Sequence, residues 1–147
     1  MAAAPAILGR EDLTADLCAL GVAPGDGLFV HTSLGKIGHV LGGPRGLIEA
    51  LIDTVGDAGL IAMPGFSRDA YDPVDLGGAD LSPEEHQRIL DQVPGYDPAR
   101  SNAAKNGAVP EAFRAWPSAV RSPHPTSSVI MFGPDAADIA AAHDPQG

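Results

Sequence analysis

A chain of 147 residues is long enough to form one domain with its own core. Its 44% hydrophobic content excludes wholesale disorder, and no apolar run is long enough to cross a bilayer. The net charge of −10 argues against nucleic acid as a partner and is compatible with a cationic ligand.

The first half of the chain alternates helix and strand signals. Gly21 and Gly56 end the two helical patterns, and Pro44 lies in the first turn of the second one. A strand, a crossover helix and a strand make a βαβ unit, for which a parallel pair is expected. The predicted elements are a helix over 11–20, a strand over 27–33, a helix over 42–56 and a strand over 60–64.

The single cysteine, Cys18, belongs to the first of these helices. One cysteine excludes an internal disulfide and suits a reducing compartment, so we expect a cytoplasmic protein. Its place in the apolar series of Leu13, Leu17 and Leu20 predicts a buried, structural thiol.

The second half continues the alternation after a polar stretch. Ser82, Pro83 and Glu85 form the pattern of a capped helix start. The whole succession indicates an α/β layered domain with a mainly parallel sheet, in which no element after the last helix closes the sheet. The predicted elements are a helix over 82–93, a loop over 94–106, a short helix over 110–115, a strand over 128–133 and a helix over 134–144.

Several familiar catalytic motifs are absent from the sequence. GFSRD (65–69) lacks the second glycine of a nucleophile elbow, and GKIG (35–38) lacks the spacing of a P-loop. No G-x-G-x-x-G follows a strand, which leaves dinucleotide binding without support. The five histidines have neither H-x-x-x-H spacing nor a cysteine partner, so no metal is expected.

Two segments remain as candidate sites. His31, Thr32 and Ser33 lie where the first strand ends, and the following loop (34–43) has four glycines that let backbone amides approach an anion. In RSPHP (121–125) two prolines stiffen the chain around a histidine beside an arginine. Both segments face one crevice if the third strand lies beside the first. The alternatives are a packed core histidine and a simple turn.

An acidic stretch separates these two segments. Between Asp69 and Asp97 there are eight acidic residues and one basic residue, Arg88. A cationic ligand is one explanation of this charge, and a solvated surface is the other.

Five segments occur in an order that resembles a known family, the aminoglycoside 3-N-acetyltransferases (antibiotic N-acetyltransferases). The resemblance implies a three-layer α/β/α enzyme that transfers an acetyl group from acetyl-CoA to the 3-amino group of the 2-deoxystreptamine ring of aminoglycosides, which confers antibiotic resistance. The segments are LFVHTSLGKIGHVLGG (28–43), GLIEALIDTVGDAGLIAMPGF (46–66), YDPARS (96–101), NGAVPEAFR (106–114) and RSPHPTSSVIMFG (121–133).

The resemblance also implies roles for individual residues. The attacking amine must first lose a proton, and His31 is the expected catalytic or site-organising histidine of this chain. Carboxylates would steer and orient a polycationic aminoglycoside. The expected acetyl-CoA contacts are Thr32, Ser33, Leu34, Gly35, Lys36, Arg121, Ser122 and His124, and the expected substrate contacts are Asp69, Asp72 and Asp75.

The sequence also departs from the family pattern. Family members continue past this point into a region with a characteristic SP motif and then a T-S-x-H segment that holds the usual principal base, and that region is not among these residues. We therefore expect residues 1–147 to be the N-terminal portion of a single domain, incomplete at its C-terminus. The alternatives are a non-catalytic module that binds coenzyme A or polycations, and an acetyltransferase for another amine.

Overall fold

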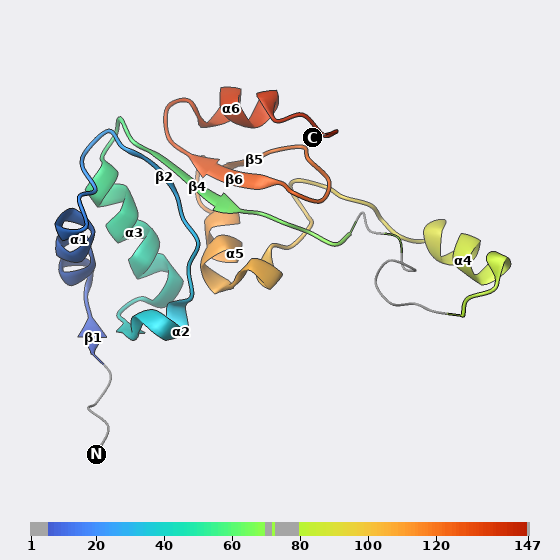
Figure 1. Cartoon of the computed structure of the whole chain (residues 1–147), viewed down its shortest axis with the longest axis horizontal. Coiled ribbons are helices and arrows are strands. Elements are labelled where there is room, and N and C mark those ends of the chain that lie inside the picture. Colours follow the sequence, from blue (N-terminus) through green and yellow to red (C-terminus); the bar gives the residue numbers. More distant parts are fainter. Residues whose placement is uncertain (1–5, 70–71, 73–79, 147) are drawn as a thin grey trace, which may run out of the picture.

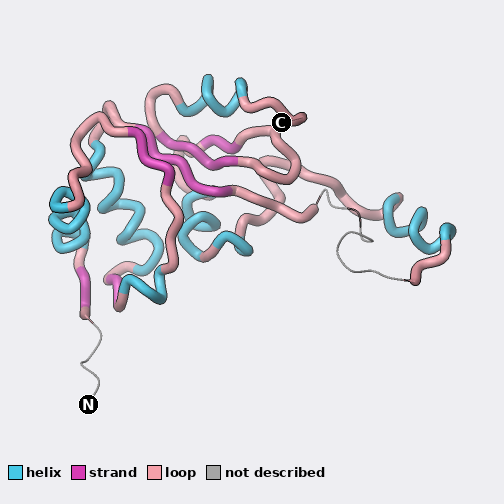
Figure 2. Tube along the Cα trace, viewed as in Figure 1, coloured by secondary structure: helices cyan, strands magenta, loops and turns pink. Residues whose placement is uncertain are grey.

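The computed structural model describes residues 6–69, 72 and 80–146, and its helices and strands alternate along the first half of the chain (Figure 1). Figure 2 shows how much of the chain between these elements is loop. In order, the elements are β1 (Ile7–Leu8), α1 (Arg10–Ala19), β2 (Gly27–Phe29), α2 (Leu34–Ile37), β3 (His39–Val40), α3 (Gly43–Val55), β4 (Leu60–Pro64), α4 (Pro83–Leu90), the 3₁₀ helix η1 (Ala104–Asn106), α5 (Ala108–Arg114), β5 (Val120–Arg121), β6 (Val129–Phe132) and α6 (Ala136–Ala142).

The central sheet has the strand order β2-β4-β6-β5. β2 pairs with β4 in parallel, whereas β4 with β6 and β5 with β6 are antiparallel pairs. The expectation of a mainly parallel sheet is therefore wrong, because this sheet is mixed. Only a short loop joins β5 to β6, and a parallel neighbour needs a crossover of a dozen residues or more.

The predicted βαβ unit is confirmed by the parallel pairing of β2 and β4, in which Gly27 lies opposite Leu60. The crossover helix α3 has Pro44 in its first turn and ends at Gly56, as the sequence predicts. Its apolar positions recur every three or four residues, so they form one face that packs into the core. The buried members of this face include Leu47, Ile48, Leu51 and Val55.

Helices cover both faces of the sheet. Successive residues of a strand point to opposite faces, so each strand contributes side chains to the packing on both sides. Ile61 and Met63 of β4 belong to the larger core, together with residues of α1, α3 and α5. Ala62 lies between them in the sequence and belongs to a smaller core with Ala136 and Ala140 of α6. Figure 1 shows α6 on one side of the sheet and α3 and α5 on the other.

The helix α1 has the predicted position, but the prediction of a buried Cys18 is wrong. Leu13 is buried and Leu17 is half-buried, since four residues bring a helix back to the same face. Cys18 follows Leu17 and therefore lies about 100° further around the helix, where it is exposed.

Five short elements were not predicted from the sequence, among them η1, which lies in the predicted loop over 94–106. β1 pairs with β3 to form a separate two-stranded parallel sheet, and α2 and β5 lie in segments expected to be loops. The predicted strand over 27–33 is shorter than expected, because β2 ends at Phe29. One further hydrogen bond, from the Val30 N–H to the Ala62 carbonyl at 2.8 Å, extends its pairing with β4.

The helix α4 begins with the predicted cap. The Ser82 hydroxyl accepts a hydrogen bond from the Glu85 N–H, and the Glu85 carboxylate accepts one from the Ser82 N–H. In Figure 1 this helix lies to one side of the sheet. Across the described ranges, which omit 1–5, 70–71, 73–79 and 147, no helix has the length and apolar character required to cross a membrane.

Candidate functional site

Loops that are far apart in the sequence meet at one edge of the central sheet, the edge formed by the ends of its strands. β2 and β4 end at this edge because they are parallel, and β6 begins there because it is antiparallel to β4. The Gly65 N–H donates to the Ser128 carbonyl at 2.8 Å, and the Asn106 side chain donates to the Phe66 carbonyl at 2.8 Å. We call residues 31–36, 65–69, 98–107 and 121–128 the strand-end loops.

The two predicted segments thus lie at the same sheet edge, although the third predicted strand does not lie beside the first. The third predicted strand, β6, is not beside the first, β2, because β4 lies between them. Parallel pairing places β4 next to β2, and the antiparallel β6 occupies the other side of β4. The RSPHP segment therefore reaches this edge with β4 between its own strand pair and β2.

His31 is not a packed core residue. Its side chain is exposed, and its ring lies against the Phe29 ring with 5.1 Å between centroids. Phe29 itself is 54% exposed, so the pair forms an open surface on one face of the sheet. An exposed imidazole at the end of a strand is accessible to a ligand and to protons from solvent.

The loop after His31 presents a mixed surface. Ser33, Gly35 and Lys36 are exposed, Thr32 is half-buried, and Leu34 packs against the larger core. The Ser33 carbonyl accepts a hydrogen bond from the Lys36 N–H at 2.8 Å, which closes the turn of α2. This arrangement leaves a hydroxyl and an ammonium group free to face a polar ligand.

An apolar hollow of about 460 Å³ lies on the same face of the sheet. It reaches from Phe29, which contacts His31, to His143, whose ring stacks on His124 with 5.0 Å between centroids. The hollow therefore adjoins both predicted histidines. Its lining consists of Phe29, Leu60, Ala62, Val129, Met131, Ile139, Ala142 and His143.

The side chains of Ser122 and His124 form hydrogen bonds within the protein. The Ser122 hydroxyl is fully buried, accepts a hydrogen bond from the Val129 N–H, and lies 2.9 Å from Nδ1 of His143. Nδ1 of His124 accepts hydrogen bonds from the N–H groups of Thr126 and Ser127, at 3.3 and 2.9 Å. A buried serine next to a histidine is here a structural contact, because a nucleophile must reach its substrate.

The acidic residues predicted to contact substrate lie in different surroundings. Asp69 is half-buried in the loop after β4, and its N–H donates to the Ser67 hydroxyl at 3.1 Å. A carboxylate oxygen of Asp72 lies 2.7 Å from Nε2 of His86 in α4. Asp75 lies outside the described residues.

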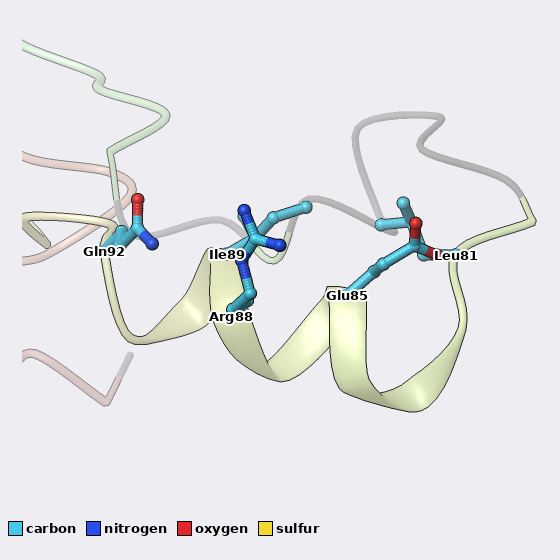
Figure 3. A pocket seen from close by; sticks show the side chains of 5 residues that line it. All are labelled: Leu81, Glu85, Arg88, Ile89 and Gln92. Atoms are coloured by element: carbon cyan, nitrogen blue, oxygen red, sulfur yellow. The ribbon is translucent and has the colours of Figure 1, made fainter.

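A second hollow, shown in Figure 3, is formed by α4 and the residues at its ends. Its lining residues are Leu81, Glu85, Arg88, Ile89 and Gln92, and none of them belongs to the strand-end loops. Glu85 already serves the helix cap, and its pKa is held below the ordinary value by hydrogen bonds from Ser82. This hollow is therefore not part of the candidate site.

A family model described as aminoglycoside 3-N-acetyltransferase matches residues 29–147. The chain belongs to this family of acetyltransferases. It is 44% identical to aminoglycoside N(3)-acetyltransferase VIII of Streptomyces fradiae over 99% of the chain, and 39% identical to aminoglycoside N(3)-acetyltransferase IX of Micromonospora chalcea over 91%. The resemblance found in the sequence is thus confirmed.

Solved acetyltransferase structures share the fold of this chain. The YokD protein of Bacillus subtilis superposes with a TM-score of 0.89 at 33% identity, covering 97% of this chain and 53% of that one. AAC-IIIb in a binary complex with CoASH superposes with a TM-score of 0.82 at 35% identity, covering 95% and 51%. The chain spans about half the length of the acetyltransferases it matches, 51% and 47% for the Streptomyces and Micromonospora proteins.

Two acetyltransferase residues at this edge were missed by sequence reasoning. Tyr96 donates a hydrogen bond to the Ser122 carbonyl at 2.7 Å, and Glu111 accepts one from the Ala103 N–H. Tyr96 joins segments 26 residues apart, and Glu111 ties α5 to the loop just before it, eight residues away. Both lie in segments that carried the family resemblance, YDPARS and NGAVPEAFR, and that was the available signal.

Glu111 makes the stability of this acetyltransferase fold depend on pH. Its carboxylate accepts two hydrogen bonds from the Arg114 guanidinium, at 2.6 and 3.1 Å. These bonds lower the pKa of Glu111, burial opposes them, and the Ala103 N–H lowers the pKa further. Because the folded pKa is the lower one, the stabilisation is present above the ordinary carboxyl pKa and is lost as the pH falls through the folded value.

We expect Glu111→Gln to lower the free energy of unfolding by about 1–2 kcal/mol at pH 7, and by progressively less as the pH falls through the lowered folded pKa of Glu111. The measurement is urea unfolding at a series of pH values. Glu11→Gln, in the exposed first turn of α1, is the matched control and should change the stability by no more than about 0.5 kcal/mol. The same pH dependence in both variants would show that the ion pair of Glu111 contributes nothing.

Proposed function

We propose that this protein transfers an acetyl group from acetyl-CoA to the 3-amino group of the 2-deoxystreptamine ring of aminoglycosides, and so confers antibiotic resistance. The observation that carries the proposal is the 44% identity to the Streptomyces fradiae acetyltransferase, which extends over 99% of this chain. Structures similar to this one include AAC-IIIb with CoASH and AAC-VIa with sisomicin. Both kinds of ligand that the reaction needs thus occur among proteins with this fold.

We propose His31 as the catalytic histidine of this portion of the domain, which would take part in removing the proton of the attacking amine. An ammonium has no lone pair, so the nitrogen must be deprotonated before it forms a bond to the thioester carbon. The carbon–sulfur bond then breaks, and the thiolate of coenzyme A leaves. His31 is exposed beside the Thr32–Lys36 loop, whose amides and hydroxyls are candidate donors to the oxyanion of the tetrahedral intermediate.

For acetyl-CoA we propose two groups of contacts. Thr32, Ser33, Leu34, Gly35 and Lys36 would hold it directly, since the exposed hydroxyl of Ser33 and the ammonium of Lys36 suit its polar and anionic parts. The second group would act through the shape of its loop, because its side chains are hydrogen-bonded to the protein itself. This second group consists of Arg121, Ser122 and His124.

For the aminoglycoside we propose contacts with the acidic loop after β4. An aminoglycoside is a polycation, and three carboxylates would attract it: those of Asp69, Asp72 and Asp75. The net charge of −10 would add a longer-range attraction that weakens as salt is added. No metal is proposed for the reaction, because deprotonation by a histidine and hydrogen bonds to the oxyanion supply the necessary chemistry.

We further propose that residues 1–147 correspond to the N-terminal portion of one acetyltransferase domain with three α/β/α layers, and that the protein is cytoplasmic. The helices on both faces of the sheet support the layered arrangement. The single cysteine supports a reducing compartment.

The test is to incubate the protein with acetyl-CoA and gentamicin, and to follow both thiol release and the mass of the antibiotic. The proposal expects free thiol and a product heavier by one acetyl group, in equal amounts. If calorimetry shows binding of both ligands but no thiol is released, the protein is a non-catalytic binding module and not an enzyme. Turnover of another amine with gentamicin left unchanged would support acetyl transfer but would reject aminoglycosides as the substrate.

A further inference from the structure

The guanidinium of Arg121, at the end of β5, is directed into the protein and joins three of its segments. Nε donates to the Ser128 hydroxyl at 3.0 Å. One terminal nitrogen donates to the carbonyl groups of Ser101 and, at 3.5 Å, Pro98, and the other donates to the carbonyl of Gly65. These acceptors lie 7 to 56 residues away in the sequence, so the side chain connects parts of the chain that have no local reason to meet.

The immediate surroundings of Arg121 enclose it further. The guanidinium carbon lies 5.1 Å from the centroid of the Tyr96 ring, which is a cation–π distance. Burial lowers the pKa of Arg121, but an arginine remains protonated over the whole physiological range. The charge is therefore retained and is satisfied by backbone carbonyls and by an aromatic face.

The contact between Arg121 and Gly65 leaves no room for a side chain. A Cβ atom on Gly65 would lie 3.1 Å from Nε of Arg121 and 2.9 Å from the Ile130 side chain. The Gly65 carbonyl also accepts a hydrogen bond from the Ser128 hydroxyl at 2.6 Å. The loop after β4 is thus held against Arg121 at its first residue.

That loop carries the first of the acidic residues proposed to contact substrate. Phe66 is held by Asn106, and Ser67 is buried and accepts a hydrogen bond from the Asp69 N–H. A displacement at Gly65 would therefore be passed on to Asp69 through a short, well-bonded segment.

We propose that Arg121 is a positioning residue, which sets the loop of residues 65–69 against the loop of residues 98–101 and so governs the affinity for a polycationic substrate, instead of binding coenzyme A itself. The part of this inference that concerns ligands rests on the proposed function. A lysine cannot replace the planar fork of an arginine at several acceptors, although its ammonium can reach one of them.

The test compares Arg121→Ala and Arg121→Lys with the wild type and with a matched control, Arg100→Ala. The Arg100 side chain is 89% exposed and has an ion pair with Asp97 at 3.6 Å. The first readout is amide hydrogen exchange at Gly65 and Ser101, relative to the amides of α3. The second readout is calorimetric affinity for gentamicin and, separately, for acetyl-CoA.

Arg121→Ala is expected to speed exchange at Gly65 and Ser101 at least about tenfold relative to α3, and to weaken gentamicin binding about tenfold. Acetyl-CoA affinity should fall by a clearly smaller factor, about threefold or less, because Arg121 would act on the cofactor only through the shape of its loop. Arg121→Lys should show smaller changes than Arg121→Ala in both amide exchange and gentamicin affinity. Arg100→Ala should resemble the wild type. If Arg121→Ala fails to fold, the same comparison is made with Arg121→Lys.

Other outcomes distinguish the positioning role of Arg121 from the proposed function. Unchanged exchange at Gly65 and Ser101 would overturn the positioning role. A loss of acetyl-CoA affinity with gentamicin affinity intact would overturn it in favour of a direct contact with the cofactor. If the wild type binds neither probe, the proposed function fails, and the exchange rates alone support or reject Arg121 as a positioning residue.

Discussion

Replacing His31 with alanine is expected to lower kcat/KM for acetyl transfer at least about a hundredfold, because a positioned general base contributes about 10²–10⁴ to a rate. The structure makes this expectation specific to His31, whose ring is exposed at the sheet edge and lies 5.1 Å from the Phe29 ring. The loss should fall mainly on kcat, since the imidazole is proposed to move a proton and not to hold either ligand. The measurement is steady-state thiol release at saturating acetyl-CoA.

His39 offers the matched control for His31. It is also exposed, but it belongs to β3, in the separate two-stranded sheet. His39→Ala should keep kcat/KM within about twofold of the wild type. If His31→Ala retains its kcat and the pH dependence of kcat is unaltered, His31 is not the base. A raised KM at constant kcat would instead make His31 a binding residue.

Replacing Phe113 with alanine is expected to lower the free energy of unfolding by about 3–5 kcal/mol, the range for phenylalanine-to-alanine changes in cores. Phe113 is fully buried in α5, within the core that α3 and the central sheet share. Its removal leaves a cavity that α3 and β4 cannot close without losing their own contacts. Stability of a domain is itself about 5–15 kcal/mol, so the variant should be close to unfolding at 37 °C.

The measurement for Phe113 is urea unfolding followed by circular dichroism. Phe66→Ala is the control, because Phe66 is 43% exposed and should lose no more than about 1 kcal/mol. Equal destabilisation by the two variants would contradict the assignment of the core. Phe113→Leu keeps most of the volume and provides a milder variant whose loss can be measured if Phe113→Ala does not fold.

The features that the sequence predicts well are those with local causes. α3 begins near Pro44 and ends at Gly56, and β4 spans 60–64 as expected. The cap at Ser82 is also local, since its two hydrogen bonds join residues three positions apart. A proline, a glycine or a capping serine acts on its own turn, so its effect can be deduced from neighbours in the sequence.

The candidate site was predicted only in part. The two segments that were singled out, around His31 and Arg121, do lie at one edge of the sheet. The sequence did not show which strand lies between them, because the pairing of β4 with β6 depends on which side of β4 remains free once β2 has paired with it. Short strands such as β5 leave too few residues for a period of two to appear in the sequence.

The sequence by itself determined the family, the helices and strands with local signals, and the segments that contain the candidate residues. Only the tertiary structure decided which way each side chain points. It exposes Cys18 and His31, buries Ser122, and turns Arg121 towards Gly65. The physical reason is that burial and hydrogen bonding at these positions depend on partners tens of residues away, and no local pattern contains that information.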